Sequence, residues 1–177
     1  MLAQLPYLLR RTDLITDFHT LYQTYAPLVR RFAVFLCGNP ALADDITADT
    51  FVRAWRSQEK IREATVKAYL FTIARNVYRD YMRRQKPMSE LKESIADPSL
   101  NLQTRAEQKV EVSELMSTLQ QFPEIDRAAL LMRVQEEMTY EEIAHALELP
   151  LSSVKVKIHR LRLKLIKARA AVQEVRS

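Results

Sequence analysis

The segment 139–165 constrains the fold most, because it fits two helices separated by a sharp corner. Thr139 and Glu142 are spaced as a capping box, in which each side chain binds the backbone amide of the other residue. The apolar residues that follow have helical spacing: Ile143, Ala144 and Leu147. The first helix must end before Pro150, because a proline pushes the preceding residue out of helical space.

A strongly basic helix follows this corner. We expect Ser152 to be its N-cap, with Ser153 as a competitor. An apolar stripe that must face inward runs along it: Val154, Ile158, Leu161 and Leu165. Residues 152–177 carry eight Lys and Arg against one Glu, a net charge of +7, whereas residues 136–148 hold five acids and no Lys or Arg. A field this positive attracts phosphates.

This arrangement predicts a helix-turn-helix whose second helix enters the major groove of DNA. The candidate DNA-contacting residues lie on that helix: Ser153, Lys155, Val156, Lys157, His159, Arg160 and Arg162. We expect Val156, His159 and Arg160 to reach base edges. The cations Lys155, Lys157 and Arg162 are expected to hold phosphates. The alternative is a solvated basic helix without a ligand, but the corner and the capping box together favour DNA binding.

The rest of the chain also favours helices. Its 177 residues include one Gly and seven Pro, too few turn residues for a β-rich fold. Hydrophobic residues make up 47%, enough for a core. No apolar run is long enough to span a bilayer, and residues 1–11 do not resemble a secretory signal. We therefore predict an all-α cytoplasmic protein.

The residues offer no chemistry for catalysis or metal binding. Cys37 is the only cysteine and is expected to be a small hydrophobic residue of the core. The three histidines lie far apart in the sequence: His19, His145 and His159. Because metal-ligand spacing is missing, we expect no metal, no cofactor and no enzymatic activity.

The helical pattern divides into two domains. We expect one helix across 18–36, a break at Gly38-Asn39-Pro40, a second helix across about 41–57 and a third across about 65–85. The helical spacing of apolar residues is absent across 86–102, which predicts a flexible linker there. Helical spacing resumes at Val112, and Pro123 suits the first turn of the next helix. The predicted boundaries are 13–86 for the first domain, 87–104 for the linker and 105–172 for the second domain.

The third expected helix mixes aromatic and basic residues, as single-stranded nucleic-acid sites do. Its polar residues form a candidate groove: Arg75, Asn76, Arg79, Arg83, Arg84 and Lys86. In the alternative interpretation the tyrosines Tyr69, Tyr78 and Tyr81 are core anchors, and Asp80 pairs with a nearby arginine.

The second expected helix begins with acids instead. Asp44, Asp45 and Asp49 lie near its start, where the helix dipole favours negative charge. Paired aspartates also bind metals, but no His, Glu or Gly-rich loop supports such a site here. An acidic face on a basic protein favours a protein partner.

These three segments, in this order, resemble the extracytoplasmic-function sigma factors of bacterial RNA polymerase. Residues 44–55 are similar to the helix of that family that binds the polymerase clamp, and residues 69–84 to its minus-ten recognition and melting helix. Residues 122–165 are similar to its fourth region, which reads the minus-thirty-five element.

The resemblance implies particular site residues and partners. It implies polymerase binding through Asp45, Asp49, Phe51 and Arg53. It also implies minus-ten binding and melting by a second set: Tyr69, Arg75, Asn76, Arg79, Asp80, Arg83 and Arg84. The implied partners are promoter DNA, the clamp helices of the largest polymerase subunit, the flap of the second-largest subunit and an anti-sigma factor.

The chain departs from the family pattern at four positions. Glu148 stands where the corner usually has Gly, and in left-handed space it would cost about 1 kcal/mol. Ser152 replaces another usual Gly, Ala48 replaces a frequent Gln, and Val156 replaces a small polar residue. The last change predicts an unusual promoter preference.

Two other functions fit the same residues. One is a free-standing helix-turn-helix repressor or activator, which would bind an operator without polymerase. The other is a protein-interaction adaptor whose basic helix serves only solubility.

Overall fold

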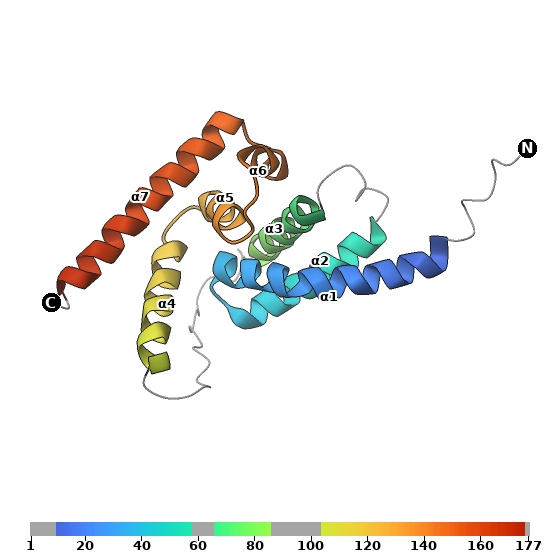
Figure 1. Cartoon of the computed structure of the whole chain (residues 1–177), viewed down its shortest axis with the longest axis horizontal. Coiled ribbons are helices and arrows are strands. Elements are labelled where there is room, and N and C mark those ends of the chain that lie inside the picture. Colours follow the sequence, from blue (N-terminus) through green and yellow to red (C-terminus); the bar gives the residue numbers. More distant parts are fainter. Residues whose placement is uncertain (1–9, 58–65, 86–103, 176–177) are drawn as a thin grey trace, which may run out of the picture.

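The computed structural model describes residues 10–57, 66–85 and 104–175, and every regular element within these ranges is a helix. The predicted all-α fold is confirmed. Helices α1 (Arg10–Cys37), α2 (Pro40–Arg56) and α3 (Val66–Gln85) form an N-terminal bundle (Figure 1). Four helices form a C-terminal bundle: α4 (Thr104–Gln120), α5 (Glu124–Val134), α6 (Tyr140–Leu147) and α7 (Leu151–Val175). The predicted linker and the predicted absence of a signal segment concern residues outside the described part.

The N-terminal bundle is held by large apolar side chains at helical spacing. Phe32 of α1 and Phe71 of α3 are fully buried, and their ring centroids lie 4.9 Å apart. Ile46 of α2 is 1% exposed. Each side chain of this size contributes roughly 1.5–3 kcal/mol when it leaves water, so the three helices depend on one another for stability.

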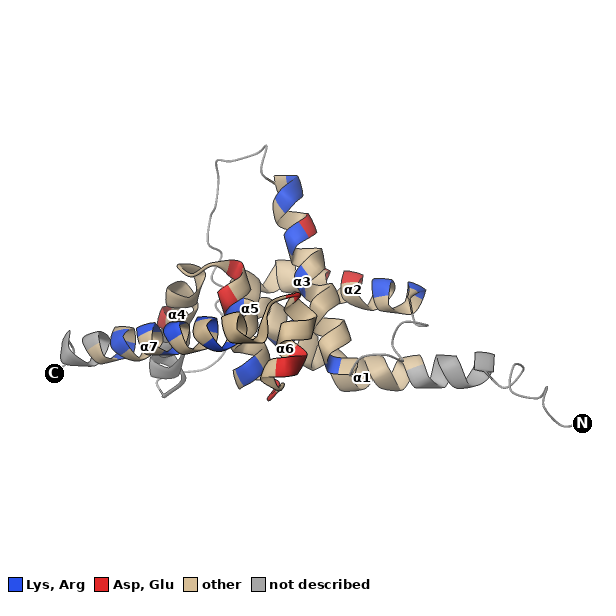
Figure 2. Ribbon diagram, turned by 90° about the horizontal axis from the view of Figure 1, so that it is seen from above, with Lys and Arg blue, Asp and Glu red and all other residues tan. Residues whose placement is uncertain are grey.

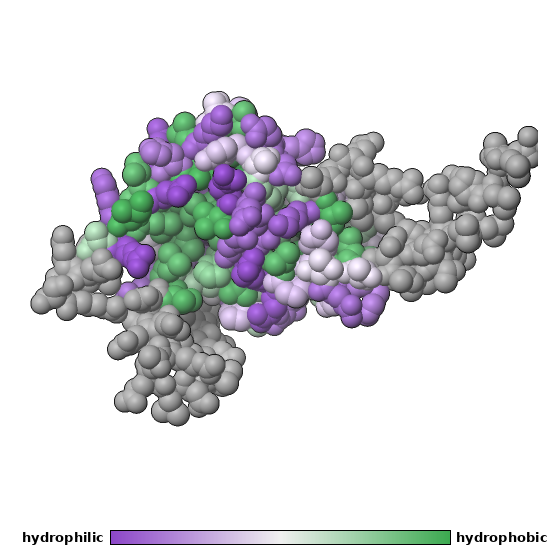
Figure 3. Space-filling model, in the orientation of Figure 1, coloured by the Kyte–Doolittle hydropathy of each residue, from purple (hydrophilic) through white to green (hydrophobic). Residues whose placement is uncertain are grey.

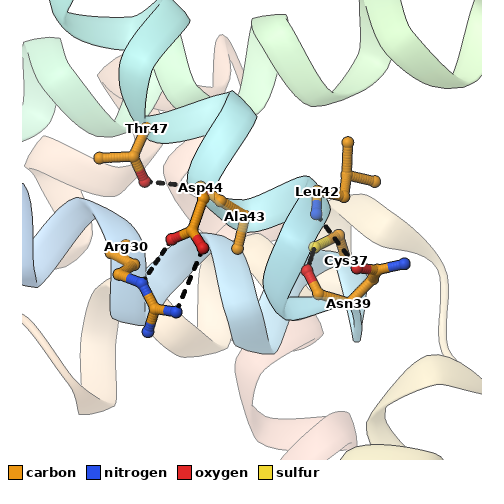
Figure 4. Close-up of polar contacts among 7 residues, drawn as sticks. All are labelled: Arg30, Cys37, Asn39, Leu42, Ala43, Asp44 and Thr47. Carbon is orange, nitrogen blue, oxygen red and sulfur yellow. Dashed lines mark hydrogen bonds and ion pairs between the residues drawn. The ribbon is translucent and has the colours of Figure 1, made fainter. Parts of the chain in front are cut away.

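The break between α1 and α2 has the predicted chemistry. Gly38 ends α1 with a φ of 71°, which glycine adopts without steric cost. The side chain of Asn39 then accepts a hydrogen bond from the Leu42 amide at 3.1 Å and caps α2 (Figure 4). Arg30 of α1 donates to Asp44 of α2 at 2.6 Å across the same corner. Asp44, one of the acids expected near the start of this helix, therefore pairs with the preceding helix.

The predicted capping box and the left-handed corner are both present before α7. The Thr139 hydroxyl accepts from the Glu142 amide at 3.1 Å, and the Thr139 amide donates to the Glu142 carboxylate at 2.7 Å. Glu148 has a φ of 53° and a ψ of 45°. This is the left-handed conformation considered for this corner position, where the sigma family usually has glycine. The amide of Leu149 donates to the Ala144 carbonyl at 2.9 Å and closes this corner.

The prediction that Ser152 caps the basic helix was wrong. Helix α7 begins at Leu151, and the Pro150 carbonyl accepts the first helical hydrogen bond from Val154 at 3.2 Å. Ser152 and Ser153 therefore lie inside the first turn. The corner is shorter than predicted because left-handed Glu148 reverses the chain within three residues.

The inward stripe of α7 is confirmed for Val154, Ile158 and Leu161, which are at most 2% exposed, whereas Leu165 is only partly buried. It packs mainly against α5 and α6. The two bundles also contact one another, with α5 against α1 and α6 against α3 (Figure 1). Their buried residues form one continuous hydrophobic cluster. No helix in the described ranges has both the length and the apolar character to cross a membrane.

Replacing Glu148 with glycine should stabilise the protein. The left-handed conformation costs a residue with a side chain roughly 1–2 kcal/mol, and the greater freedom of glycine in the unfolded chain offsets part of the gain. We expect the free energy of unfolding to rise by about 0.5–1 kcal/mol in urea titrations followed by circular dichroism. The control is His145→Gly, on the exposed side of α6, which should lower it by about 0.5–1 kcal/mol. Equal losses in both variants would rule out strain at Glu148.

Candidate nucleic-acid interface

The outward face of α7 carries the basic residues predicted to contact DNA. Lysines and arginines follow this helix and the C-terminal end of α3 (Figure 2). Five of the predicted residues are exposed: Lys155, Val156, His159, Arg160 and Arg162. They lie opposite the buried stripe, so the packing that fixes α7 turns these side chains to solvent. A helix presented in this way fits the major groove.

Two of the predicted α7 residues have other neighbours. Lys157 forms an ion pair with Asp126 of α5, with 2.7 Å between Nζ and Oδ1, and both side chains are less than one-third exposed. This pair ties α7 to α5. Ser153 is half-buried in the first turn of the helix. Periodicity alone could not reveal the Asp126 contact, because it joins residues 31 positions apart.

Tyr140 contacts another basic residue of α7. Its ring centroid lies 5.8 Å from the Lys155 ammonium and 5.0 Å from the Arg133 guanidinium. Cation–π contacts at partly exposed sites contribute about 0.5–1 kcal/mol. Sequence reasoning missed Tyr140, although an aromatic residue directly after a helix cap is a detectable signal.

The C-terminal half of α3 presents a second basic surface. Four of the predicted residues are exposed there: Asn76, Arg79, Arg83 and Arg84. Tyr69 is half-buried at the other end of α3, and its hydroxyl donates to the Ser57 carbonyl at 3.2 Å. The structure thus brings together only part of the predicted groove.

Arg75 is separated from that groove. It lies on the side of α3 that faces the C-terminal bundle, where it is 7% exposed and forms a bidentate pair with Glu124 of α5. Tyr78 is a core anchor, as the alternative interpretation proposed, and its hydroxyl accepts from Arg127 at 3.3 Å. Arg75, Arg79 and Arg83 follow one another at four-residue steps, a spacing that suggests one face of the helix. The C-terminal bundle covers Arg75 and leaves Arg79 and Arg83 exposed.

The predicted polymerase-binding residues also separate into exposed and buried ones. Asp45 and Asp49 are exposed on the outer side of α2. Phe51 is 3% exposed and contacts the Tyr22 ring, with 4.8 Å between centroids, so its side chain belongs to the core of the N-terminal bundle. The sequence analysis missed Val52, which is 47% exposed. Val52 lies seven residues after Asp45 and three residues after Asp49, so helical periodicity places it on the same face of α2.

Asp80 connects α2 with the basic surface of α3. It accepts hydrogen bonds from Arg53 of α2 at 2.8 Å and from Arg83 at 2.5 Å. The predicted pairing of Asp80 with an arginine is confirmed. The hydrogen bond from Arg53 lowers the pKa of Asp80, and the charges of Arg53, Arg83 and Arg84 lower it further. Asp80 therefore orients cations, and its own charge would repel phosphate.

The stability contributed by Asp80 should disappear in acid. Because folding lowers its pKa, the ionised form is stabilising above the ordinary value of 3.8, and this contribution is lost as the pH falls through the lower folded value. At pH 7 we expect Asp80→Asn to cost about 0.5 kcal/mol, the size measured for partly exposed pairs. The difference from the wild type in thermal unfolding should stay constant from pH 7 to about pH 5 and shrink as the pH falls below the ordinary pKa of 3.8. Asp45→Asn controls for net charge, and a cost of Asp80→Asn that does not vary with pH would contradict this role.

Two family matches cover these surfaces. Sigma-70 region 2 matches residues 21–87, which contain α2 and α3, and Sigma-70 region 4 matches residues 113–165, which contain the helix-turn-helix.

Relatives match over most of their length. The extracytoplasmic-function (ECF) RNA polymerase sigma factor EcfG of Rhodopseudomonas palustris is 30% identical over 141 residues, which is 78% of this chain and 77% of the relative. The ECF RNA polymerase sigma factor SigM of Bacillus subtilis is 28% identical over 82% of this chain and 90% of its own.

Solved structures share the fold. The sigma factor RpoE of Bartonella quintana, in complex with the anti-sigma factor NepR, aligns with a TM-score of 0.74 at 24% identity, over 87% of this chain and 97% of the other. CnrH, in complex with the cytosolic domain of CnrY, aligns with a TM-score of 0.66 at 23% identity, over 90% of this chain and 89% of the other. Together with the two exposed basic surfaces, these matches show that the chain belongs to the ECF sigma factors of RNA polymerase.

Proposed function

We propose that the chain binds core RNA polymerase and directs it to promoters by holding two DNA elements on separate helices. The observation that carries this proposal is the pair of exposed basic surfaces, on α7 and on the C-terminal half of α3, in a chain that matches both sigma regions. The protein itself makes and breaks no bond, and it acts in the cytoplasm, where the polymerase is.

Helix α7 reads the upstream, minus-thirty-five element. Val156, His159 and Arg160 contact base edges in the major groove. Lys155 and Arg162 hold the phosphates on either side, and Ser153 contacts the backbone near the helix start. Lys157 is already paired with Asp126, so it reaches phosphate only by exchanging that carboxylate.

Helix α3 binds the downstream, minus-ten element as it opens. Arg79, Arg83 and Arg84 follow the backbone, and the exposed Asn76 marks where an unpaired base is held. Tyr69 lies at the other end of α3, where its hydroxyl donates to the Ser57 carbonyl. Capture of the base offsets the unstacking of the duplex, which costs a few kcal/mol.

The acidic outer side of α2 binds the polymerase. Asp45 and Asp49 meet the clamp helices of the largest subunit, and the exposed Val52 adds an apolar contact between α2 and those helices. Arg53 lies at the edge of this side and connects it through Asp80 to α3. The C-terminal bundle meets the flap of the second-largest subunit. The residue boundaries 13–86, 87–104 and 105–172 describe the two working domains and their linker.

Exposed apolar residues fit an anti-sigma partner. Hydrophobic side chains gather over α7 and α4 on the left of Figure 3. Besides Val156, which is assigned to the DNA-facing side, four large hydrophobic residues of these two helices are at least 42% exposed: Val112, Leu115, Leu163 and Ile166. Contiguous exposed apolar surface marks interaction sites. One aligned structure holds a sigma factor with an anti-sigma factor, and the other holds CnrH with the cytosolic domain of CnrY.

Substitutions on α7 separate base reading from phosphate binding. Promoter binding is measured with reconstituted holoenzyme and a pooled promoter library. Arg160→Ala should weaken the free energy of promoter binding by about 1–3 kcal/mol and relax the base preference at one position. Lys155→Ala should weaken all promoters evenly and reduce the salt slope by about one. The control is Lys167→Ala, which removes an exposed cation two turns beyond Arg160 on the same helix. It should change neither the base preference nor the salt slope.

The rival functions give other results. A strong palindromic footprint from the protein without polymerase would indicate a free-standing repressor or activator. Unchanged promoter-directed transcription after replacement of Lys155, Lys157 and Arg160 with alanine would indicate an adaptor.

A further inference from the structure

One lysine of the DNA-facing helix α7 is held within the protein by a carboxylate. The ammonium nitrogen of Lys157 lies 2.7 Å from Oδ1 of Asp126 in α5, and the two side chains are 30% and 23% exposed. A charge-assisted hydrogen bond of this kind is about twice as strong as a neutral one. Because both groups are partly removed from water, salt screens their attraction less than that of a fully exposed pair. Lys157 therefore has an anionic partner before any DNA arrives.

The position of Asp126 does not depend on this ion pair. Asp126 lies in the first turn of α5, where the helix dipole favours a negative charge. Helix α5 packs against α7 (Figure 1), and the inward side of α7 around Val154 and Ile158 is buried. The apolar packing of the two helices thus keeps the carboxylate beside Lys157.

Helical geometry places Lys157 at the flank of the DNA-facing side. At 3.6 residues per turn, Lys157 points about 160° away from His159, about 60° from Arg160 and about 60° from the buried Val154. Its exposure agrees with this position, because Lys157 is half-buried whereas His159 and Arg160 are exposed. From such a flank a free lysine reaches a phosphate beside the groove, but it does not reach the base edges in front of His159.

The ion pair removes one phosphate contact from α7. Binding to DNA of any sequence comes essentially from cations that meet phosphates, and each contact adds about 0.9 to the slope of log affinity against log salt. A lysine that exchanges one anionic oxygen for another gains little free energy. The proposed base-edge contacts of Val156, His159 and Arg160 do not involve Asp126, so they keep their full contribution.

The loss is greater on DNA that lacks the upstream element. On the element, the base contacts fix α7 with Lys157 at its flank. On other sequences no base contact fixes the helix, so a freed Lys157 turns to the nearest phosphate. A charge that suppresses this contact lowers non-specific affinity more than specific affinity.

We propose that Asp126 is a specificity-determining residue, which keeps Lys157 from phosphate and so raises the preference of α7 for its own element over other DNA. This inference rests on the proposed function and deepens it. It assigns a carboxylate of α5 to promoter selection, and it removes Lys157 from the cations that hold phosphates. The ratio of the two affinities matters because non-specific sites greatly outnumber promoters.

The first measurement follows binding of the full chain to a duplex of scrambled sequence by fluorescence anisotropy, from about 50 to about 200 mM salt. The test variant is Asp126→Asn, which keeps the side-chain volume and frees Lys157. We expect the salt slope to rise by about one and the affinity at about 0.1 M salt to rise about eightfold, the gain from one added contact.

Substitution of Lys157 separates this role from a structural one. In the wild type, Lys157→Ala breaks the same ion pair but should leave the salt slope unchanged, because Lys157 makes no phosphate contact there. In the Asp126→Asn background, Lys157→Ala should return the slope to the wild-type value. Asp126→Glu, which restores the carboxylate, should keep the low wild-type affinity for scrambled DNA.

The matched control is Asp44→Asn in the same anisotropy measurement. It changes the net charge equally and also frees an arginine, since Asp44 pairs with Arg30 at 2.6 Å far from α7 in the N-terminal bundle. Any gain that it shows measures the effect of net charge alone.

The second measurement uses holoenzyme on a promoter selected from the pooled library. For the Asp126→Asn variant, the amount of scrambled duplex that halves the promoter complexes should fall about threefold or more, because the competitor gains more than the promoter.

Three results would overturn the inference. The first is a gain from Asp126→Asn no larger than that from Asp44→Asn. The second is a salt slope that Lys157→Ala lowers by about one in the wild type, since Lys157 would then already meet phosphate. The third is an unchanged competitor requirement for Asp126→Asn. The proposed function fails differently, through the absence of promoter-directed transcription with core polymerase, whatever the chain does on scrambled DNA.

Discussion

Helix α3 is held by two different kinds of contact, and the arrangement of the whole chain depends on it. Leu70, Phe71 and Ala74 are fully buried in the apolar core where α3 packs against α1 and α2, a contact that salt does not weaken. Lys67 and Arg75, one turn before and one turn after Phe71, meet carboxylates of the C-terminal bundle. Ionic contacts of this kind return little net stability after the cost of desolvation, but they require correct partners. The first contact therefore builds the N-terminal bundle, and the second selects how the other bundle sits on it.

Ion pairs in this protein mainly position side chains. Asp126 holds Lys157 and so ties α7 to α5, and Asp80 joins Arg53 to Arg83. Arg127 is 5% exposed, and it donates to the Phe122 carbonyl at 2.8 Å as well as to Tyr78. A cation at the end of α4 is favoured by the helix dipole. The basic surfaces thus consist of cations left exposed for a ligand and cations already engaged within the fold.

Local patterns in the sequence predicted the helices and several of their ends. The capping box at Thr139 and the left-handed Glu148 depend on neighbours within a few residues, so sequence spacing reveals them. The prediction that Ser152 caps α7 was wrong. Left-handed Glu148 and Pro150 both lie just before the helix, and sequence spacing does not show which residue is the first helical one. The inward stripe of α7 was predictable because its period alone determines which side can leave water.

The sequence by itself determined an all-α chain with a basic C-terminal helix, because helical period, capping and charge are local properties. It did not determine which cations remain available. Arg75 and Arg79 are one turn apart and chemically identical, yet one is covered by Glu124 and the other is exposed. Only the tertiary structure decided this, because the contact joins residues 49 positions apart and depends on how the second bundle docks against the first.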